Sequence, residues 1–244
     1  MDVKKFSDNV WSCQIFFLIL QISSKNTKID VLENYSTIIW DLDGTLMDTL
    51  KDLWLSTNHA LKVYGMPERT YEEVRQFVGN GVRKLIERAT PDGDNNPLFE
   101  DVFNEFKRYY MLHCQDNTQP YEGIIETLHK LKEQGKRMAI VSNKLQSGVT
   151  ELHKQWFSDV IEVAVGERDG IKRKPAPDMV EVALNELGVD KQNAVYIGDS
   201  DVDIATARNS NLPCISVLWG FRDRDFLTYN GATTFAEKPE NLLS

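Results

Sequence analysis

Two aspartates, Asp41 and Asp43, lie at the end of the apolar segment 37–42 and are separated by a single residue. In an extended chain, residues i and i+2 point to the same side, so both carboxylates are expected to face one spot. Two like charges held close together are costly unless a cation or a hydrogen-bond donor compensates them. The segment is therefore either a solvated turn, with Gly44 at positive φ, or one half of a functional site.

Polar side chains also follow other apolar segments of the chain. They are Ser142 and Asn143 at the end of 137–142, Lys172, Arg173 and Lys174 in the basic loop that precedes the next helical pattern, and Asp199, Asp201 and Asp203 after 194–198. Each group has a simpler interpretation, because Ser, Asn and Asp commonly cap helices and a basic loop is often solvated. In an open parallel sheet, however, ligands bind outside the carboxyl ends of the strands. We therefore expect these side chains to meet the two aspartates in one crevice. Because all of these groups fall at strand ends or in the loops that follow them, a shared catalytic site is favoured over separate structural roles.

The residue types in this crevice fit phosphoryl transfer. A carboxylate can attack phosphorus and form an aspartyl phosphate, which divides one displacement into two easier steps. A second carboxyl group can protonate the leaving alkoxide and later deprotonate water. A lysine and a hydroxyl or amide group can hold the phosphoryl oxygens. Mg²⁺ prefers hard oxygen ligands and compensates the charges of carboxylates and phosphate, so we expect it as the cofactor.

Strand-like apolar segments alternate with helical patterns through the rest of the chain. The expected strands are 37–42, 137–142, 160–165, 194–198 and 213–217, with a weaker one at 232–236. Two of the helices between them are expected to end near Gly135 and Gly188. This alternation predicts an α/β fold with a Rossmann-like parallel sheet and helices on both of its faces.

A long insert without a convincing strand follows the first expected strand. Apolar residues recur there at helical spacing in 50–64, 82–89 and 99–110. We expect the insert, 49–118, to form an α-helical cap domain over the carboxyl edge of the sheet. The catalytic core then comprises 35–48 and 119–244.

The N-terminal extension, residues 1–34, has no role that the sequence identifies. Within it, 10–23 is uncharged and follows Lys4 and Lys5, a layout similar to that of a secretory signal. No Ala-x-Ala-like cleavage site follows, and the apolar run is too short to span a bilayer. We interpret it as an extra amphipathic or irregular arm; the alternative is an uncleaved anchor on a membrane surface.

The composition of the 244-residue chain disfavours several classes of protein. Apolar residues make up 41% of it, which is too many for a disordered chain. The formal net charge of −9 disfavours nucleic-acid binding, which needs a basic face. The three cysteines lie far apart, so neither a disulfide framework nor a zinc site is indicated, and a cytoplasmic location fits best. We expect a monomer or a homodimer without nucleic-acid or membrane partners.

Four short motifs resemble those of the haloacid dehalogenase superfamily of phosphatases and occur in the same order. They are DLDGTLMDT from Asp41, VSNK from Val141, Lys174 within KPAP, and GDSDVD from Gly198. The resemblance runs from about residue 37 to the C-terminus, and the N-terminal extension has no counterpart in it. It implies phosphate chemistry in place of dehalogenation, because dehalogenases of the superfamily lack an acid at the position of Asp43.

The resemblance also implies a role for each site residue. Asp41 would be the nucleophile and Asp43 the general acid/base. The Mg²⁺ ligands would be the Asp41 side chain, the Asp43 backbone carbonyl and the Asp199 side chain. Asp203 would orient Lys174 or a metal-bound water. The phosphoryl group would be held by Ser142, the Asn143 amide and Lys174.

One stretch of the expected cap, FVGNGVRKLIERA at 77–89, is similar to the corresponding stretch of phosphoglycolate phosphatases. The glycines around Asn80 would present backbone amides to an anion at the start of a helix near Val82, and Arg83 would add positive charge. A substrate carboxylate would suit this position. A plain turn between two cap helices is the alternative, because paired glycines serve both purposes.

The leading hypothesis is therefore a Mg²⁺-dependent phosphomonoesterase acting on 2-phosphoglycolate or another small phosphorylated metabolite. A pyrophosphatase, a nucleotide or sugar phosphatase, or a β-phosphoglucomutase-like enzyme would share this mechanism. The alternative from another class is a catalytically silent binding or regulatory protein of the same fold.

Overall fold

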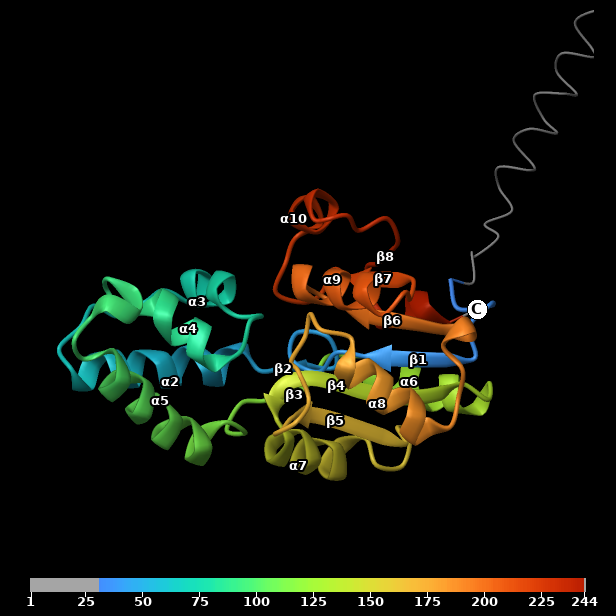
Figure 1. The fold of residues 1–244 in the computed structure, drawn as a ribbon, viewed down its shortest axis with the longest axis horizontal. Helices are drawn as coiled ribbons and strands as arrows, with labels where there is room; N and C mark the ends of the chain where they lie inside the picture. Colours follow the sequence, from blue (N-terminus) through green and yellow to red (C-terminus); the bar gives the residue numbers. More distant parts are fainter. Residues whose placement is uncertain (1–30, 244) are drawn as a thin grey trace, which may run out of the picture.

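The computed structural model describes residues 31–243, and their main feature is a six-stranded parallel sheet (Figure 1). The strand order is β5-β4-β1-β6-β7-β8. The strands are β1 (Thr37–Trp40), β4 (Arg137–Leu145), β5 (Val163–Glu167), β6 (Ala194–Gly198), β7 (Cys214–Val217) and β8 (Phe235–Ala236). Because β4 lies on one side of β1 and β6 on the other, the winding direction reverses here. A ligand crevice is expected at the carboxyl ends of these central strands.

Helices cover both faces of the sheet, which confirms the predicted α/β fold. On one face, α6 and α7 share an apolar cluster with Ile38 and Trp40; on the other, α8 and α9 share a cluster with Ile39. All three strand residues are fully buried, which explains why the segment reads as a continuous apolar run. The helices of the sheet region are α6 (Ile124–Glu133), α7 (Gln146–Trp156), α8 (Asp178–Leu187), α9 (Asp201–Asn209) and α10 (Arg224–Tyr229).

The insert after β1 consists mainly of helices that lie beyond one end of the sheet (Figure 1). Leu61, Ile86 and Phe106 are fully buried in an apolar cluster that these helices share. The helical stripes of the sequence therefore form a second core, as expected. The helices are α2 (Leu50–Val63), α3 (Tyr71–Phe77), α4 (Val82–Ala89) and α5 (Phe99–His113), with a short 3₁₀ turn at Gly93–Asn95.

Two short strands join the helical insert to the sheet region. β2 (Met47–Asp48) pairs antiparallel with β3 (Gln119–Pro120). Beside them, the buried carboxylate of Asp52 accepts hydrogen bonds from the backbone and side chain of Asn117 and of Thr118, at 2.7 to 3.1 Å. The entering and leaving segments are thus tied together. Strands of two residues have no periodic pattern, so the sequence did not predict them.

The observed strand limits differ from the predicted ones at several ends. The strand predicted at 137–142 continues to Leu145, and the one predicted at 160–165 runs from Val163 to Glu167. Between the pairs Val141 with Val165 and Leu145 with Glu167, β4 holds two more residues than β5, which is a β-bulge. Shorter differences occur elsewhere: β1 ends at Trp40, β7 begins at Cys214, and the weak strand 232–236 is reduced to Phe235–Ala236.

The apolar segment 10–23 lies outside the described residues, so its predicted role as an arm stays a prediction. Among residues 31–243, no helix combines the length and the apolar character needed to cross a membrane.

Candidate active site

The carboxyl ends of β1 and β6 bring three aspartates together. Asp41 directly follows β1, Asp199 directly follows β6, and Asp203 lies in the first turn of α9. One carboxylate oxygen of each lies within 4.8 Å of the others, and all three residues are buried. The sequence motifs thus converge at one edge of the sheet, as the parallel topology predicts.

A buried lysine lies among these acids. Nζ of Lys174 lies 2.7 Å from Oδ1 of Asp41 and 2.8 Å from Oδ1 of Asp203. It also donates to the hydroxyl of Tyr196 at 3.0 Å, a contact that the sequence did not predict. Burial opposes the charge of the ammonium, but the carboxylates of Asp203 and Asp41 raise the pKa of Lys174 well above its ordinary value. The lysine is therefore held in its charged form.

Asn143 holds the segment that carries this lysine. Its Oδ1 accepts from the Lys174 amide at 2.8 Å, and its Nδ2 donates to the Lys174 carbonyl at 3.1 Å. This side-chain contact is additional to the phosphate-binding role that was predicted for the Asn143 amide. Ser142 is buried beside it, and its Oγ accepts from the amide of Lys144 at 3.2 Å.

The carboxylates carry more negative charge than Lys174 compensates. Burial raises the pKa of Asp41 well above its ordinary value, and Asp203 adds to this shift by repulsion. Burial, again with repulsion from Asp203, raises the pKa of Asp199 to about 7. A bound divalent cation would remove this penalty, and carboxylate oxygens are the hard ligands that Mg²⁺ prefers. The donor set therefore fits Mg²⁺.

Two glycines allow the backbone to approach Asp199. A Cβ atom at Gly44, which has a φ of +89°, would lie 2.5 Å from Oδ2 of Asp199. A Cβ atom at Gly220 would lie 2.4 Å from Cβ of Asp199 and 2.3 Å from the Gly44 carbonyl oxygen. Any larger residue would displace this carboxylate, so both glycines are needed for its position.

Asp203 differs from the other acids because its oxygens already have protein partners. Oδ1 accepts from Lys174 and from the Tyr196 hydroxyl, at 2.8 and 3.1 Å. Oδ2 accepts from the Ser200 hydroxyl at 2.6 Å and from the Ser200 amide at 3.1 Å, which forms a capping box at the start of α9. This arrangement fits an acid that orients Lys174.

Asp43 lies apart from the three clustered acids. Its side chain is 22% exposed, and its Oδ1 lies 3.3 Å from Nζ of Lys144. Nζ of Lys144 also donates to the hydroxyl of Tyr110 on α5, at 2.8 Å. Neither Lys144 nor Tyr110 was predicted as a site residue. Lys144 ends the VSNK motif but was given no role there, and an isolated tyrosine such as Tyr110 has no distinguishing sequence signal.

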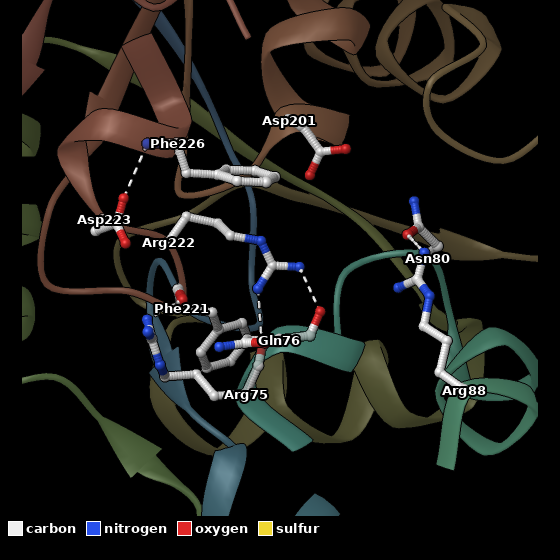
Figure 2. A pocket seen from close by; sticks show the side chains of 9 residues that line it. All are labelled: Arg75, Gln76, Asn80, Arg88, Asp201, Phe221, Arg222, Asp223 and Phe226. Atoms are coloured by element: carbon white, nitrogen blue, oxygen red, sulfur yellow. Dashed lines mark hydrogen bonds between the residues drawn. The ribbon is translucent and has the colours of Figure 1, made fainter. Parts of the chain in front are cut away.

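The two predicted specificity residues have different surroundings. Asn80 lines a cavity of about 390 Å³, and its Oδ1 accepts from Nη2 of Arg88 at 2.7 Å (Figure 2). Arg83 is not among the residues that line this cavity. Its guanidinium pairs with Glu100 and lies over the rings of Phe99 and Phe103, within the helical insert. The structure thus places Asn80 at the cavity but not Arg83.

A loop after β7 connects the cavity to the acidic cluster. The amide of Phe221 donates to Oδ2 of Asp199 at 2.7 Å, while its side chain is buried in the cluster of the helical insert. The neighbouring Arg222 donates to the carbonyl groups of Arg75, Gln76 and Val78 on the other wall, and Figure 2 shows the first two of these contacts. Arg75 in turn donates to the Phe221 carbonyl. The helical insert and the acidic cluster are therefore linked through two consecutive residues.

Comparison with known proteins agrees with this geometry. The model of the haloacid dehalogenase-like hydrolase family matches residues 38–217. The chain belongs to this family. Within it, the chain is 33% identical to a phosphoglycolate phosphatase of Aquifex aeolicus, over 75% of this chain and 85% of the relative. It is 34% identical to a phosphoglycolate phosphatase of Agrobacterium fabrum, over 76% of this chain and 81% of the relative.

A solved structure of the same haloacid dehalogenase-like type confirms the fold. A crystal structure assigned as a phosphoglycolate phosphatase of Lactobacillus delbrueckii subsp. bulgaricus superposes with a TM-score of 0.82 and is 36% identical. The match covers 86% of this chain and 97% of that one. Family, fold and relatives together show that this haloacid dehalogenase-like hydrolase is a phosphatase, as the sequence motifs predicted.

Proposed function

We propose that this phosphatase is a Mg²⁺-dependent phosphomonoesterase that acts on 2-phosphoglycolate or a similarly small phosphorylated acid. The observation that supports it best is the contact of Lys174 with Asp41 and Asp203, beside Asp199, at the carboxyl edge of the sheet. A buried carboxylate next to a fixed ammonium is suited to attack phosphorus, because the ammonium favours the ionised form of the carboxylate, against the effect of burial, and attracts the phosphoryl oxygens.

In this proposal the residues divide the reaction between them. Asp41 attacks the phosphorus atom and forms an aspartyl phosphate as the alkoxide leaves. Asp43, which is partly exposed, gives a proton to that alkoxide and later removes one from the attacking water. The phosphoryl oxygens are held by Ser142, the amide of Asn143 and Lys174.

Three groups would hold the metal: the carboxylates of Asp41 and Asp199, and the backbone carbonyl of Asp43. Mg²⁺ supplies the positive charge that lets an anionic phosphate approach ionised carboxylates. Glycines 44 and 220 keep space for this arrangement around Asp199.

The cavity beside Asn80 supports an acidic substrate. Three arginines line it, Arg75, Arg88 and Arg222, together with the carboxylates of Asp201 and Asp223. Arg75 is paired with Glu72, so Arg88 and Arg222 are the two that we propose attract a substrate anion. The chain's relatives are named as phosphoglycolate phosphatases, whose substrate carries a carboxylate next to the phosphate ester. The helices at 49–118, as a cap domain on a core of 35–48 and 119–244, would close over such a substrate and exclude water.

The test is phosphate release from 2-phosphoglycolate, pyrophosphate, a nucleoside monophosphate and a sugar phosphate, each with Mg²⁺ and with a chelator. We expect the highest kcat/KM for 2-phosphoglycolate and loss of activity with the chelator. If another compound is hydrolysed with a higher kcat/KM, that compound and not 2-phosphoglycolate is the preferred substrate. Isomerisation of a sugar phosphate without phosphate release would identify a mutase.

The nucleophile is tested with Asp41→Asn, which keeps the shape of the side chain. We expect turnover to fall more than roughly 1,000-fold while the protein stays folded, because Lys174 keeps Asp203 as a partner. Asp190→Asn is the matched control, because Asp190 is exposed at the opposite, amino end of β6. Normal turnover by Asp41→Asn would exclude Asp41 as the nucleophile.

The proposal also includes a cytoplasmic location and a monomeric or homodimeric state, tested by fractionation and by light scattering. Removal of residues 1–30 tests the N-terminal extension and keeps Leu32, which is buried in the apolar cluster of the sheet region. We expect the shortened protein to stay soluble and active.

A further inference from the structure

The β-bulge of β4 holds Lys144 at a defined place in the active site. Ser142, Asn143 and Lys144 lie in the irregular part of the strand, where the ladder to β5 shifts its register. A Cβ atom at Gly166 of β5 would lie 2.9 Å from the Lys144 carbonyl oxygen and 2.7 Å from Cα of Gln146. The backbone therefore approaches β5 more closely than any residue with a side chain would permit.

Just after the bulge, the side chain of Gln146 forms hydrogen bonds with β5 in place of the backbone of β4. Nε2 of Gln146 donates to the Ala164 carbonyl at 3.0 Å, and its Oε1 accepts from the Gly166 amide at 2.8 Å. These bonds satisfy β5 backbone groups where β4 leaves them. The backbone of Lys144 is thus held from both sides, which limits the positions that its side chain can reach.

The ammonium of Lys144 lies where three parts of the molecule meet. Its side chain is 10% exposed, and Nζ lies 3.3 Å from Oδ1 of Asp43, which follows β1. Nζ also donates to the hydroxyl of Tyr110 at 2.8 Å, and the Tyr110 ring stacks on Phe106 inside the helical insert. The lysine therefore contacts the proposed acid/base and the helical insert at the same time.

The two aspartates after β1 have separate lysine partners. Asp41 is paired with Lys174, whose other acid partner, Asp203, belongs to the sheet region. Asp43 is paired with Lys144, whose other partner is Tyr110 of the insert. A partly exposed carboxyl group without a partner would rotate freely, and small misplacements of a catalytic group cost large factors in rate.

We propose that Lys144 is a positioning residue for Asp43, and that Tyr110 completes this arrangement when the helical insert lies against the sheet region. The ammonium orients the Asp43 carboxyl group toward the leaving-group oxygen, and the phenol fixes the ammonium. This inference rests on the proposed acid/base role of Asp43. It links proton transfer to the placement of the insert, because the phenol comes from α5.

The test compares two substrates whose leaving groups differ in their need for a proton. The alkoxide of 2-phosphoglycolate must be protonated as it leaves, whereas the p-nitrophenolate of p-nitrophenyl phosphate leaves without protonation. For Lys144→Met we expect kcat/KM to fall about 10- to 100-fold for 2-phosphoglycolate and less than about 3-fold for p-nitrophenyl phosphate. Lys144→Arg should restore part of the loss. A purely structural role would lower kcat/KM for both substrates equally, and that result would overturn the inference.

Asp43→Asn separates failure of the inference from failure of the proposed function. We expect Asp43→Asn to show the same selectivity for the leaving group, with a loss of about 10²- to 10⁴-fold for 2-phosphoglycolate. Adding Lys144→Met to it should change kcat/KM less than about 2-fold, because Lys144 acts through Asp43. Equal losses on both substrates in Asp43→Asn would remove Asp43 from the acid/base role. If Asp43→Asn loses more activity on 2-phosphoglycolate than on p-nitrophenyl phosphate but Lys144→Met does not, the positioning role of Lys144 is overturned and the acid/base role of Asp43 stands.

Tyr110→Phe provides a second variant that does not depend on the folding of Lys144→Met. It removes the hydroxyl and keeps the ring that stacks on Phe106. We expect the same leaving-group selectivity, with a loss of about 3- to 10-fold on 2-phosphoglycolate. Tyr109→Phe is the matched control, because that ring stacks on His59 and His113 within the insert, and we expect it to leave both substrates unaffected. Equal losses on both substrates in Tyr110→Phe would contradict the inference.

Discussion

Nζ of Lys174 lies 2.7 Å from Oδ1 of Asp41, although 133 positions separate the two residues in the chain. The lysine side chain is 3% exposed and that of Asp41 is 9% exposed, so the pair is almost removed from water. Such a pair is stabilising only while both members are present, because a single buried charge has no solvent to compensate it. The same contact on which the proposed catalysis depends is therefore also important for folding.

Lys174→Met is expected to lower both stability and activity. It leaves the carboxylates of Asp41 and Asp203 without their cation, so the free energy of unfolding should fall by about 3–5 kcal/mol. Phosphate release should fall by at least about 100-fold. Urea denaturation and a phosphate assay measure the two effects. Lys172→Met, at an exposed position two residues earlier, should change neither. An active Lys174→Met variant of normal stability would contradict the assigned contacts.

Metal binding is expected to depend on pH through Asp199. Burial raises the pKa of its carboxyl group from the ordinary 3.8 to about 7 in the metal-free protein. The folded state then binds this proton more tightly than the unfolded state, so the stability contribution of the group falls as the pH rises from about 4 to about 7. Mg²⁺ competes with the proton and removes the penalty of the ionised form.

The Mg²⁺-induced increase in Tm should therefore be larger near pH 8 than near pH 6. Differential scanning fluorimetry with and without Mg²⁺ at both values measures it. Asp199→Asn should lose most of the increase at both pH values. An increase that is the same at both, or larger near pH 6, would show that protonation of Asp199 does not control metal binding.

Gly220→Ala is expected to disturb the metal site without any strain at a positive φ. The added methyl group would overlap the Gly44 carbonyl and Cβ of Asp199. We expect Mg²⁺ affinity to fall at least about 10-fold and the free energy of unfolding to fall by about 1–3 kcal/mol. Isothermal titration calorimetry measures the first. Gly135→Ala, where a Cβ atom meets nothing within 4 Å, should keep normal Mg²⁺ affinity. Equal affinity in the two variants would rule out the crowding argument.

Asp52→Ala is expected to loosen the junction between the helical insert and the sheet region. It leaves the buried amides of Asn117 and Thr118 without their acceptor, so the free energy of unfolding should fall by about 2–3 kcal/mol. Limited proteolysis should also cut faster around 114–118. Asp101→Ala, at an exposed position in the first turn of α5, should cost less than about 1 kcal/mol. Unchanged proteolysis in Asp52→Ala would mean that this carboxylate does not hold the junction.

Residue pattern alone was enough to locate the acidic cluster. Asp41 and Asp199 end apolar segments that form neighbouring parallel strands, and the carboxyl ends of such strands share one edge. Lys174 was found by its motif, which no spacing rule would have distinguished from an exposed basic loop. The helical stripes of the insert were equally readable, because their period of about 3.6 residues is a local property.

Contacts between residues far apart in the chain could not be predicted from the residue pattern. The β-bulge that carries Lys144 depends on the close approach of Gly166, and the partners of Lys144 lie 34 and 101 positions away. Arg83 looked suited to a substrate anion, yet Glu100 and two aromatic rings of the insert hold it. Arg222 had no motif, but it reaches three carbonyl groups of the opposite wall.

The sequence by itself determined which segments become strands, which acids follow them and which segment becomes helical, because these depend on neighbours within a few residues. Only the tertiary structure decided which lysine pairs with which aspartate and which arginines line the cavity. A long side chain takes the partner that the packed chain brings within reach, and that distance is set by the whole fold.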